Sequence, residues 1–403
     1  MATPKLQIPN GMQDTLPGEC RARRELEERF RRLFQLSGYR EIETPILEYY
    51  DVLSDKTYGY RPEHVWKTFD SFGHVLAIRP DSTIPCARLA AGALRGWPLP
   101  LRLFYTQSAS NYQSDTLSML CEQPQAGLEL MGEDAAAADA EAISLAVSCL
   151  ESAGLREYQI ELGHAAFFAG FMQEAGLEED QIREIRTLLE HKDALGMQLY
   201  LRSIRMNEQV AQRLIRLPRL YGGPEILDEA AALTEHPVCR EALHRLRTVI
   251  ALLEDFGCSA DVTIDLGMAQ EASYYSGIIF RGHAAGVGQP ILSGGRYDGL
   301  TKRFGRALPA VGFAMMTKLL MIALERQGDS FKNPVPDYLV AGGPDSLRQV
   351  LSCVQRLRAE GQCAVPLYQE SAESLEKRLR DGQARHAVWV EASGVSRELE
   401  VCS

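Results

Sequence analysis

Residues Leu292 to Ala314 read LSGGRYDGLTKRFGRALPAVGFA, and this segment is the most informative one about the fold. Two apolar ends flank a polar centre that is rich in glycine and arginine. The spacing of Gly294 and Gly295 matches neither a phosphate-binding loop nor a dinucleotide fingerprint, so the pair predicts a tight strand turn. The chain continues with Met316, Thr317, Lys318 and Leu319, which include one lysine but no arginine.

The composition is that of a folded chain of two or three domains. Of the 403 residues 45% are hydrophobic, and the formal net charge is −11, which provides no broad cationic surface for a nucleic-acid backbone. The start MATPKLQIPNG lacks the features of a leader, and no apolar run reaches the roughly 18 residues of a membrane span. We therefore expect a cytoplasmic protein with no membrane or nucleic-acid partner.

The cysteines and histidines favour a reducing compartment over a metal site. Nine cysteines are scattered without a CxxC pair, and none stands at a metal-ligand spacing from the eight histidines. We expect free thiols and no bound metal.

Helical and strand-like patterns alternate irregularly along the first half. An amphipathic pattern predicts a helix from Ala22 to Ser37, ended by Gly38, and a strand-like segment follows over 39–49. Residues 74–91 predict a strand, a turn and a helix, and an apolar stripe predicts a second helix ending at Gly154. This irregular order favours an α+β fold over a doubly wound sheet.

The second half changes character twice. Residues 177–256 are almost wholly helical in pattern, with PRLYGGPE as an interrupting loop, and predict a helical insertion in a core of residues 1–325. Residues 334–403 predict a small unit with three parallel strands and two helices, followed by a polar tail.

The quoted stretch resembles a known signature. GGRYDGL followed by PAVGFA is similar to the third signature of class II aminoacyl-tRNA synthetases, with histidyl-tRNA synthetases as the best match. GYREIETP resembles the first signature, whose proline, here Pro45, lies at a homodimer interface. The resemblance implies an antiparallel sheet core with helices, a helical insertion, and a shortened relative of the anticodon-binding domain at residues 334–403.

The arginines of that family are missing at the aligned positions. In the family they hold the phosphates of ATP and of the aminoacyl-adenylate, which require fixed cations. The aligned residues here are Asn111, Met119, Cys121, Gln270 and Leu319. Because the flanking motifs are intact, five separated losses indicate an abandoned reaction, and we expect no catalytic residue and no cofactor.

Residues that hold the amino acid in the family are retained. Those that match the α-amino side are Asp81, Thr83 and Gln125, and those that match the imidazole side are Glu129, Tyr274 and Tyr275. Carboxylates suit an ammonium or an imidazole N–H, and tyrosine offers a ring and a hydroxyl. A cation for the ligand's carboxylate is missing, so we expect weak histidine binding.

Structural roles explain the same residues singly. Asp81 is also typical of a turn, the two tyrosines of a strand edge, and Gln125 with Glu129 of a surface pair. His164 has either a packing role or the role of the family's polar residue at that position.

The chain is identified by this pattern as a member of a branch without synthetase activity, the regulatory subunits of short-form ATP phosphoribosyltransferase. That resemblance implies a homodimer joined to separate catalytic subunits in a hetero-octamer, with histidine as effector of the first step of histidine biosynthesis. Two other functions stay open: a histidyl-tRNA synthetase with unusual substitutions, and a paralogue that senses uncharged tRNA.

Overall fold

The computed structural model describes residues 6–54, 65–110, 121–258, 262–268 and 274–399. The chain divides into two compact units, one of Met1–Asp14 with Ala22–Ser330 and one of Thr15–Arg21 with Phe331–Ser403. Within the described ranges, none of the helices is both long and apolar enough to cross a membrane.

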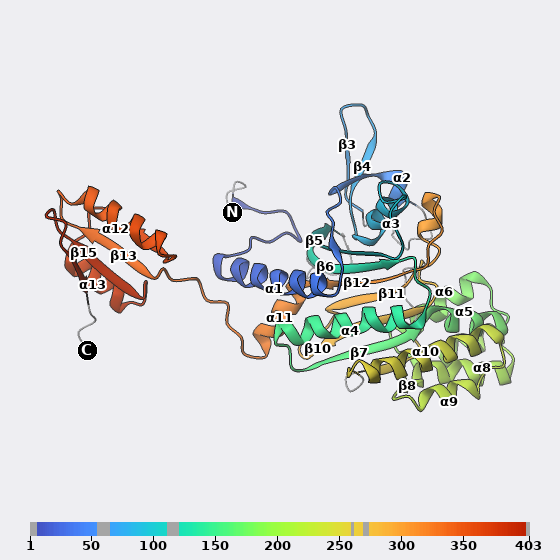
Figure 1. Ribbon diagram of the computed structural model, residues 1–403. Coiled ribbons are helices and arrows are strands. Elements are labelled where there is room, and N and C mark those ends of the chain that lie inside the picture. Colours follow the sequence, from blue (N-terminus) through green and yellow to red (C-terminus); the bar gives the residue numbers. More distant parts are fainter. Residues whose placement is uncertain (1–5, 55–64, 111–120, 259–261, 269–273, 400–403) are drawn as a thin grey trace. The chain divides into compact units, whose positions relative to one another are not determined.

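A nine-stranded sheet forms the centre of the first unit (Figure 1). Its strands, in spatial order, are β1 (Arg40–Glu41), β5 (Leu101–Ser110), β6 (Glu122–Met131), β12 (Ala310–Met316), β11 (Leu292–Arg296), β10 (Ile278–Ala284), β7 (Tyr158–His164), β9 (Val262–Asp265) and β8 (Tyr221–Gly222). Among the described strands of this sheet, only the β1–β5 and β7–β9 pairs are parallel. The α+β class with an antiparallel core is confirmed.

Two helices cover one face of this sheet, α1 (Pro17–Leu36) and α4 (Ala136–Ala153). Phe34 of α1 packs its ring 5.4 Å from that of Phe104 and 6.1 Å from that of Phe313, which lie on β5 and β12. Helix α4 ends at Gly154, whose φ of 86° closes the helix in the left-handed conformation that glycine favours. The predicted helix ends at Gly38 and Gly154 are thus confirmed.

The segment 39–49 is not one strand, as the sequence suggested, but two short ones in different sheets. Residues 42–46 leave β1, and the chain then enters β2 (Leu47–Tyr49) of a three-stranded sheet with β4 (Val75–Ile78) and β3 (Lys67–Phe69). Pro45 has no N–H for a ladder, and the Arg79 guanidinium donates to the carbonyl oxygens of Thr44 and Pro45. The proline and the buried arginine therefore explain why the strand is interrupted between β1 and β2.

Two helices accompany the three-stranded sheet, α2 (Tyr50–Leu53) and α3 (Thr83–Ala91). Their apolar side chains pack with Leu101, Leu103 and Tyr297 into one core cluster. This cluster joins the small sheet to the large one and so fixes the start of α3 beside β6.

The prediction of a tight turn at Gly294 and Gly295 is wrong, because both residues lie inside β11. Gly294 pairs with Phe280 and Phe313, and Gly295 pairs with Ile279 and Gly312. A Cβ on Gly294 would lie 2.5 Å from the Gly312 carbonyl oxygen. Glycine is needed here for close approach within a central sheet, not for a turn. The turn comes later, in the short 3₁₀ helix η5 (Thr301–Phe304), and β12 leads into α11 (Thr317–Arg326).

Between β7 and β9 the chain is mainly helical. The helices are α5 (Ala165–Glu174), α6 (Glu179–Glu190), α7 (Ala194–Ser203), α8 (Glu208–Arg216), α9 (Ile226–Ala231) and α10 (Pro237–Asp255). The segment PRLYGGPE was expected as a loop, but part of it forms β8, which pairs antiparallel with β9. Helix α10 packs against α4 and α5 and thereby connects this layer to the covered face.

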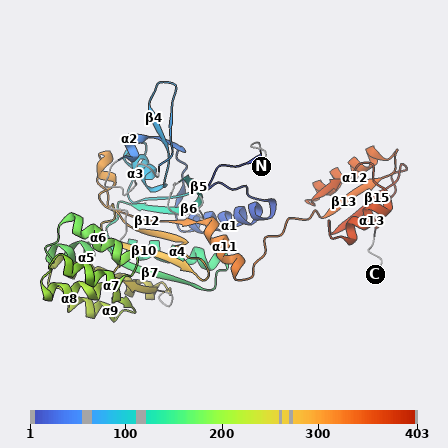
Figure 2. The ribbon, with the colours of Figure 1, turned by 180° about the vertical axis from the view of Figure 1, so that it is seen from behind.

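The second unit has a four-stranded sheet in the order β14, β13, β15, β16 (Figure 2). Its elements are β13 (Tyr338–Gly342), α12 (Leu347–Ala359), β14 (Ala364–Pro366), α13 (Ala372–Arg380), β15 (His386–Val390) and β16 (Ser396–Leu399). The three predicted parallel strands are present. The polar tail, however, turns back as β16 and pairs antiparallel with β15, with Leu399 buried.

Candidate functional site

The face of the large sheet opposite α1 and α4 carries small and polar side chains. The strand register places on it Gln107 of β5, Gln125 and Glu129 of β6, Ser293 of β11 and Arg281 of β10. Period-two alternation explains the division, since Leu128, Phe313 and Phe280 point to the helices instead. Polar groups of four strands therefore share one side of the sheet.

Glu129 is the buried centre of this face. Its side chain is 0% exposed, and the Tyr297 hydroxyl donates to Oε2. Among the described residues no hydrogen-bond partner reaches Oε1. Burial raises the pKa of Glu129 to about 8, with the opposite effect of the Tyr297 hydrogen bond outweighed. The carboxyl is thus largely protonated at neutral pH, and Thr83 lies close enough to it to oppose the rise of its pKa.

Glycine at position 312 makes the place of Glu129 possible. A Cβ there would lie 2.0 Å from Glu129 Oε2 and 2.4 Å from the Leu128 carbonyl oxygen. Gly312 is the direct β12 partner of Glu129 in the ladder. The glycine of the PAVGFA segment therefore lies where the Glu129 carboxylate passes over β12.

Three tyrosines surround the Glu129 carboxyl. The rings of Tyr274 and Tyr275 lie 4.7 Å apart, and Tyr274 meets Tyr297 edge-on at 6.0 Å. Tyr275 lies over Gly295, where a Cβ would come within 2.8 Å of its ring. Burial raises the pKa of Tyr275, so its hydroxyl stays protonated. Tyr274 and Tyr275 precede β10 in an irregular segment, not at a strand edge.

The residues expected on the α-amino side lie at the start of α3 and on β6. Asp81 Oδ1 accepts a hydrogen bond from the Ile84 amide at 3.0 Å, so the turn role is real. Asp81 and Thr83 are both close enough to influence the pKa of Glu129. Ser82 Oγ lies 3.4 Å from Gln125 Oε1, and Gln125 is only 5% exposed. The structure thus brings the six expected residues to one part of the sheet face.

Two of the expected cation positions are described, and neither holds a cation. Cys121 is buried, and its amide donates to the Gly11 carbonyl at 2.7 Å. Leu319 lines a pocket of about 210 Å³ together with Lys318 and Arg326. Lys318 Nζ donates to Gln13 Oε1 at 2.8 Å, away from the Glu129 carboxyl. The positions Asn111, Met119 and Gln270 lie outside the described residues.

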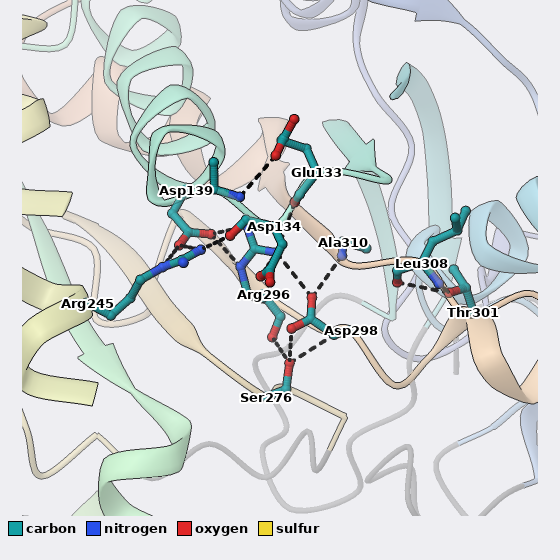
Figure 3. Close-up of polar contacts among 11 residues, drawn as sticks. Glu133, Asp134, Asp139, Arg245, Ser276, Arg296, Asp298, Thr301, Leu308 and Ala310 are labelled. Atoms are coloured by element: carbon teal, nitrogen blue, oxygen red, sulfur yellow. Dashed lines mark hydrogen bonds and ion pairs between the residues drawn. The ribbon is translucent and has the colours of Figure 1, made fainter. Parts of the chain in front are cut away.

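The arginine of the RYDG segment belongs to the other face. Arg296 binds Asp139 of α4, and the same carboxylate receives Arg245 of α10 at 2.8 Å (Figure 3). Asp298 accepts from the Ala310 amide at 2.9 Å and from Arg296 Nη1 at 3.2 Å. This network ties β11 to the covering helices and places no charge near Glu129.

His164 ends β7 on the side of that network. It is 8% exposed, and burial together with the nearby Arg245 and Arg296 lowers its pKa to about 4. The imidazole is therefore neutral at physiological pH, which suits packing.

Three functional candidates escaped the sequence analysis: Tyr297, Tyr105 and Arg281. Tyr297 lies inside the quoted stretch, and its hydroxyl touches Glu129. Tyr105 is fully buried beside Gly127, where a Cβ would meet its hydroxyl at 2.6 Å. Arg281 interrupts the apolar run IIFRGHA, and the period-two alternation of a strand would have placed it opposite Phe280.

Comparison with known proteins agrees with this architecture. A family model described as histidyl-tRNA synthetase matches residues 11–320. A histidyl-tRNA synthetase of Nostoc sp. PCC 7120 has the same fold, with a TM-score of 0.78 over 98% of this chain and 96% of that chain at 21% identity. The fold is that of a class II aminoacyl-tRNA synthetase of the histidyl type.

Relatives with higher identity carry another name. A chain from Acetivibrio thermocellus is 39% identical over 90% of this chain and 86% of its own length. One from Desulforamulus reducens is 35% identical over 97% of both chains. Both are named ATP phosphoribosyltransferase regulatory subunit, and this chain belongs to that family. A Bacillus halodurans structure titled ATP phosphoribosyltransferase regulatory subunit/histidyl-tRNA synthetase superposes with a TM-score of 0.85, at 28% identity over 96% of this chain and 98% of that chain.

Proposed function

We propose that this protein is a non-catalytic subunit that activates a separate short-form ATP phosphoribosyltransferase catalytic subunit in the first step of histidine biosynthesis. The observation that carries the proposal is family membership over nearly the full chain. The described site supports it, because Cys121 and Leu319 stand where the adenylate reaction needs arginine.

Histidine is the proposed effector, bound at the Glu129 site. A protonated Glu129 Oε1 offers a hydrogen bond to an imidazole nitrogen, and the tyrosine rings flank an aromatic ligand. Asp81 and Gln125 supply oxygens for an ammonium group. Feedback then requires that histidine binds one state of the assembly better than another.

A homodimer within a hetero-octamer is the proposed assembly. The small sheet supports a dimer contact, because it exposes apolar side chains near Pro45 in the sequence and along β3 and β4: Ile46, Leu47, Tyr49, Phe69, Phe72 and Val75. We call these six residues the apolar patch. Phe72 is 85% exposed and Phe69 71%. Several exposed apolar side chains on one small sheet and its turns are typical of interaction surfaces.

A reducing, cytoplasmic location is proposed from the thiols. Each cysteine in the described ranges is free, and most of these are buried. Unpaired buried thiols suit a compartment in which disulfides do not form.

Reconstitution tests the function directly. Purified protein is mixed with its short catalytic subunit, and formation of phosphoribosyl-ATP is followed against each component alone. We expect product formation to rise on mixing, and an unchanged rate would reject the proposal. Histidine-dependent exchange of pyrophosphate into ATP by this protein alone would instead identify a synthetase. We expect no such exchange.

A further inference from the structure

We propose that Arg281 holds the carboxylate of the amino acid bound at Glu129. The inference rests on the proposed histidine site and adds the counter-charge for which no cation had been found. It assigns a specificity role to a residue outside the positions at which the family's arginines align.

The strand register places Arg281 on the face of Glu129. Arg281 pairs with Ser293, Ser293 with Ala314, and Ala314 with Gly127, two residues before Glu129. Three strand spacings of about 4.8 Å put the backbones of Arg281 and Gly127 roughly 14 Å apart. Two long side chains that extend from these two ends leave space for one small ligand between them.

The sheet surface between Arg281 and Glu129 carries small side chains. Ala314 and Ser293 are both small and partly exposed, in contrast to the fully buried Phe313 and Leu292 that alternate with them. Ser293 has a hydroxyl with no hydrogen-bond partner in the described part of the chain. This hydroxyl lies next to Arg281 on the adjacent strand and adds a neutral donor for a carboxylate oxygen.

Within the described ranges the Arg281 guanidinium makes neither a hydrogen bond nor an ion pair, although the Glu161 carboxylate lies close enough to interact with its charge. Glu161 stands directly opposite on β7, but its carboxylate binds His283 Nε2 at 3.2 Å. By contrast, Arg102 and Arg296 of the same sheet each bind a carboxylate of α4. A half-buried guanidinium whose nitrogens are not bonded to a carboxylate can bind an external anion.

Tyr275 connects the two ends of the proposed site. Its ring lies over Gly295, which stands in the same row of the sheet as Gly312 and Glu129 and two residues after Ser293 on β11. Arg281 pairs with Ser293 on the same strand, so Tyr275 and Arg281 both lie beside the stretch 293–295 of β11. A ligand with its ring at Glu129 and Tyr275 therefore has its carboxylate toward Arg281.

Calorimetry with two ligands tests the assignment on the full-length protein. Histidine carries the carboxylate, and histamine is the same molecule without it. We expect Arg281→Gln to weaken histidine binding about tenfold or more and to leave histamine binding unchanged. Arg183→Gln on α6, 72% exposed, is the matched control and should leave both affinities unchanged.

Several results would overturn the inference. One is equal loss of histidine and histamine affinity in an Arg281→Gln variant whose thermal unfolding matches that of the wild type, because Arg281 would then not act on the carboxylate. Another is unchanged histidine affinity, and a third is absence of histidine binding by the wild type. Loss of inorganic phosphate binding alone would assign Arg281 to a phosphate instead. None of these results bears on activation of the catalytic subunit. That activation is tested separately, by measuring phosphoribosyl-ATP formation in the absence of histidine.

Discussion

Arg296 and Asp139 form a buried ion pair in which two guanidinium nitrogens, Nε at 2.8 Å and Nη2 at 2.7 Å, bind the same carboxylate oxygen. Asp139 is 0% exposed and Arg296 3% exposed. Burial raises the pKa of Asp139, against the effect of the two arginines that bind it. The pair joins β11 to α4, and Arg245 extends it to α10.

Removing the Asp139 charge should destabilise the fold. Asp139→Asn leaves two guanidinium groups around a neutral amide, and we expect a loss of about 3–5 kcal/mol in the free energy of unfolding. Urea denaturation measures this loss. Asp134→Asn is the matched control, because Asp134 is 77% exposed and lies 3.6 Å from Arg296. Its effect should stay below about 1 kcal/mol, and equal effects of the two variants would refute a special role of the buried pair.

Glu129 should make stability depend on pH. Its pKa is about 8 in the fold against 4.5 in the unfolded chain, so the folded state holds an extra proton between these values. The free energy of unfolding then falls as pH rises through that window. Glu129→Gln removes this pH dependence. Between about pH 5 and about pH 9 the free energy of unfolding of the variant should therefore rise relative to that of the wild type by an amount on the order of a few kcal/mol. Parallel pH profiles of the two proteins would contradict the raised pKa.

The contact of Gly312 with Glu129 predicts intolerance of any side chain. Gly312→Ala places a Cβ against the carboxyl and the Leu128 carbonyl, so we expect a loss of about 1–3 kcal/mol or more together with loss of histidine binding. Gly299→Ala is the control, since a Cβ there would have no atom within 4 Å. Thermal unfolding and calorimetry provide the two readouts, and a variant that keeps both properties would disprove the steric argument.

The apolar patch should control self-association. We expect Phe69→Ser with Phe72→Ser to shift the protein from dimer to monomer, as measured by light scattering after size exclusion. Leu195→Ser with Leu199→Ser alters apolar side chains of similar exposure, 66% and 58%, on α7 and should leave the mass unchanged. A double phenylalanine variant that stays dimeric would place the dimer contact elsewhere.

Much of the fold followed from local patterns. Helix ends at Gly38 and Gly154, the α+β class and the three parallel strands of the second unit were predictable, because caps and periodicity are written within a few residues. The glycines of β11 were misassigned because the reason for them lies in other strands. Gly294 is glycine on account of Phe280 and Phe313, residues that only the completed sheet brings near.

The candidate site was predictable in part, because some of its residues lie in recognisable local segments. Glu129, Gln125 and the paired tyrosines stand in segments that resemble the family, so their convergence could be expected. The role of Arg281 could not be predicted, since it depends on the contact of its neighbour Glu161 with His283, which only the folded sheet shows. Tyr297 could not be assigned to the site from the sequence, because only the folded sheet shows that its hydroxyl reaches Glu129.

Three consecutive residues at the end of β11 serve as anchors in different directions. Arg296 reaches the helices on one side, Tyr297 reaches the carboxyl on the other, and Asp298 receives the first amide of β12. The most recognisable motif of the chain therefore has a structural role, in which it connects the sheet to its surroundings. Selection for folding alone would preserve this motif even if the function of the protein changed. Its presence therefore indicates ancestry and architecture and says nothing about whether adenylates are made.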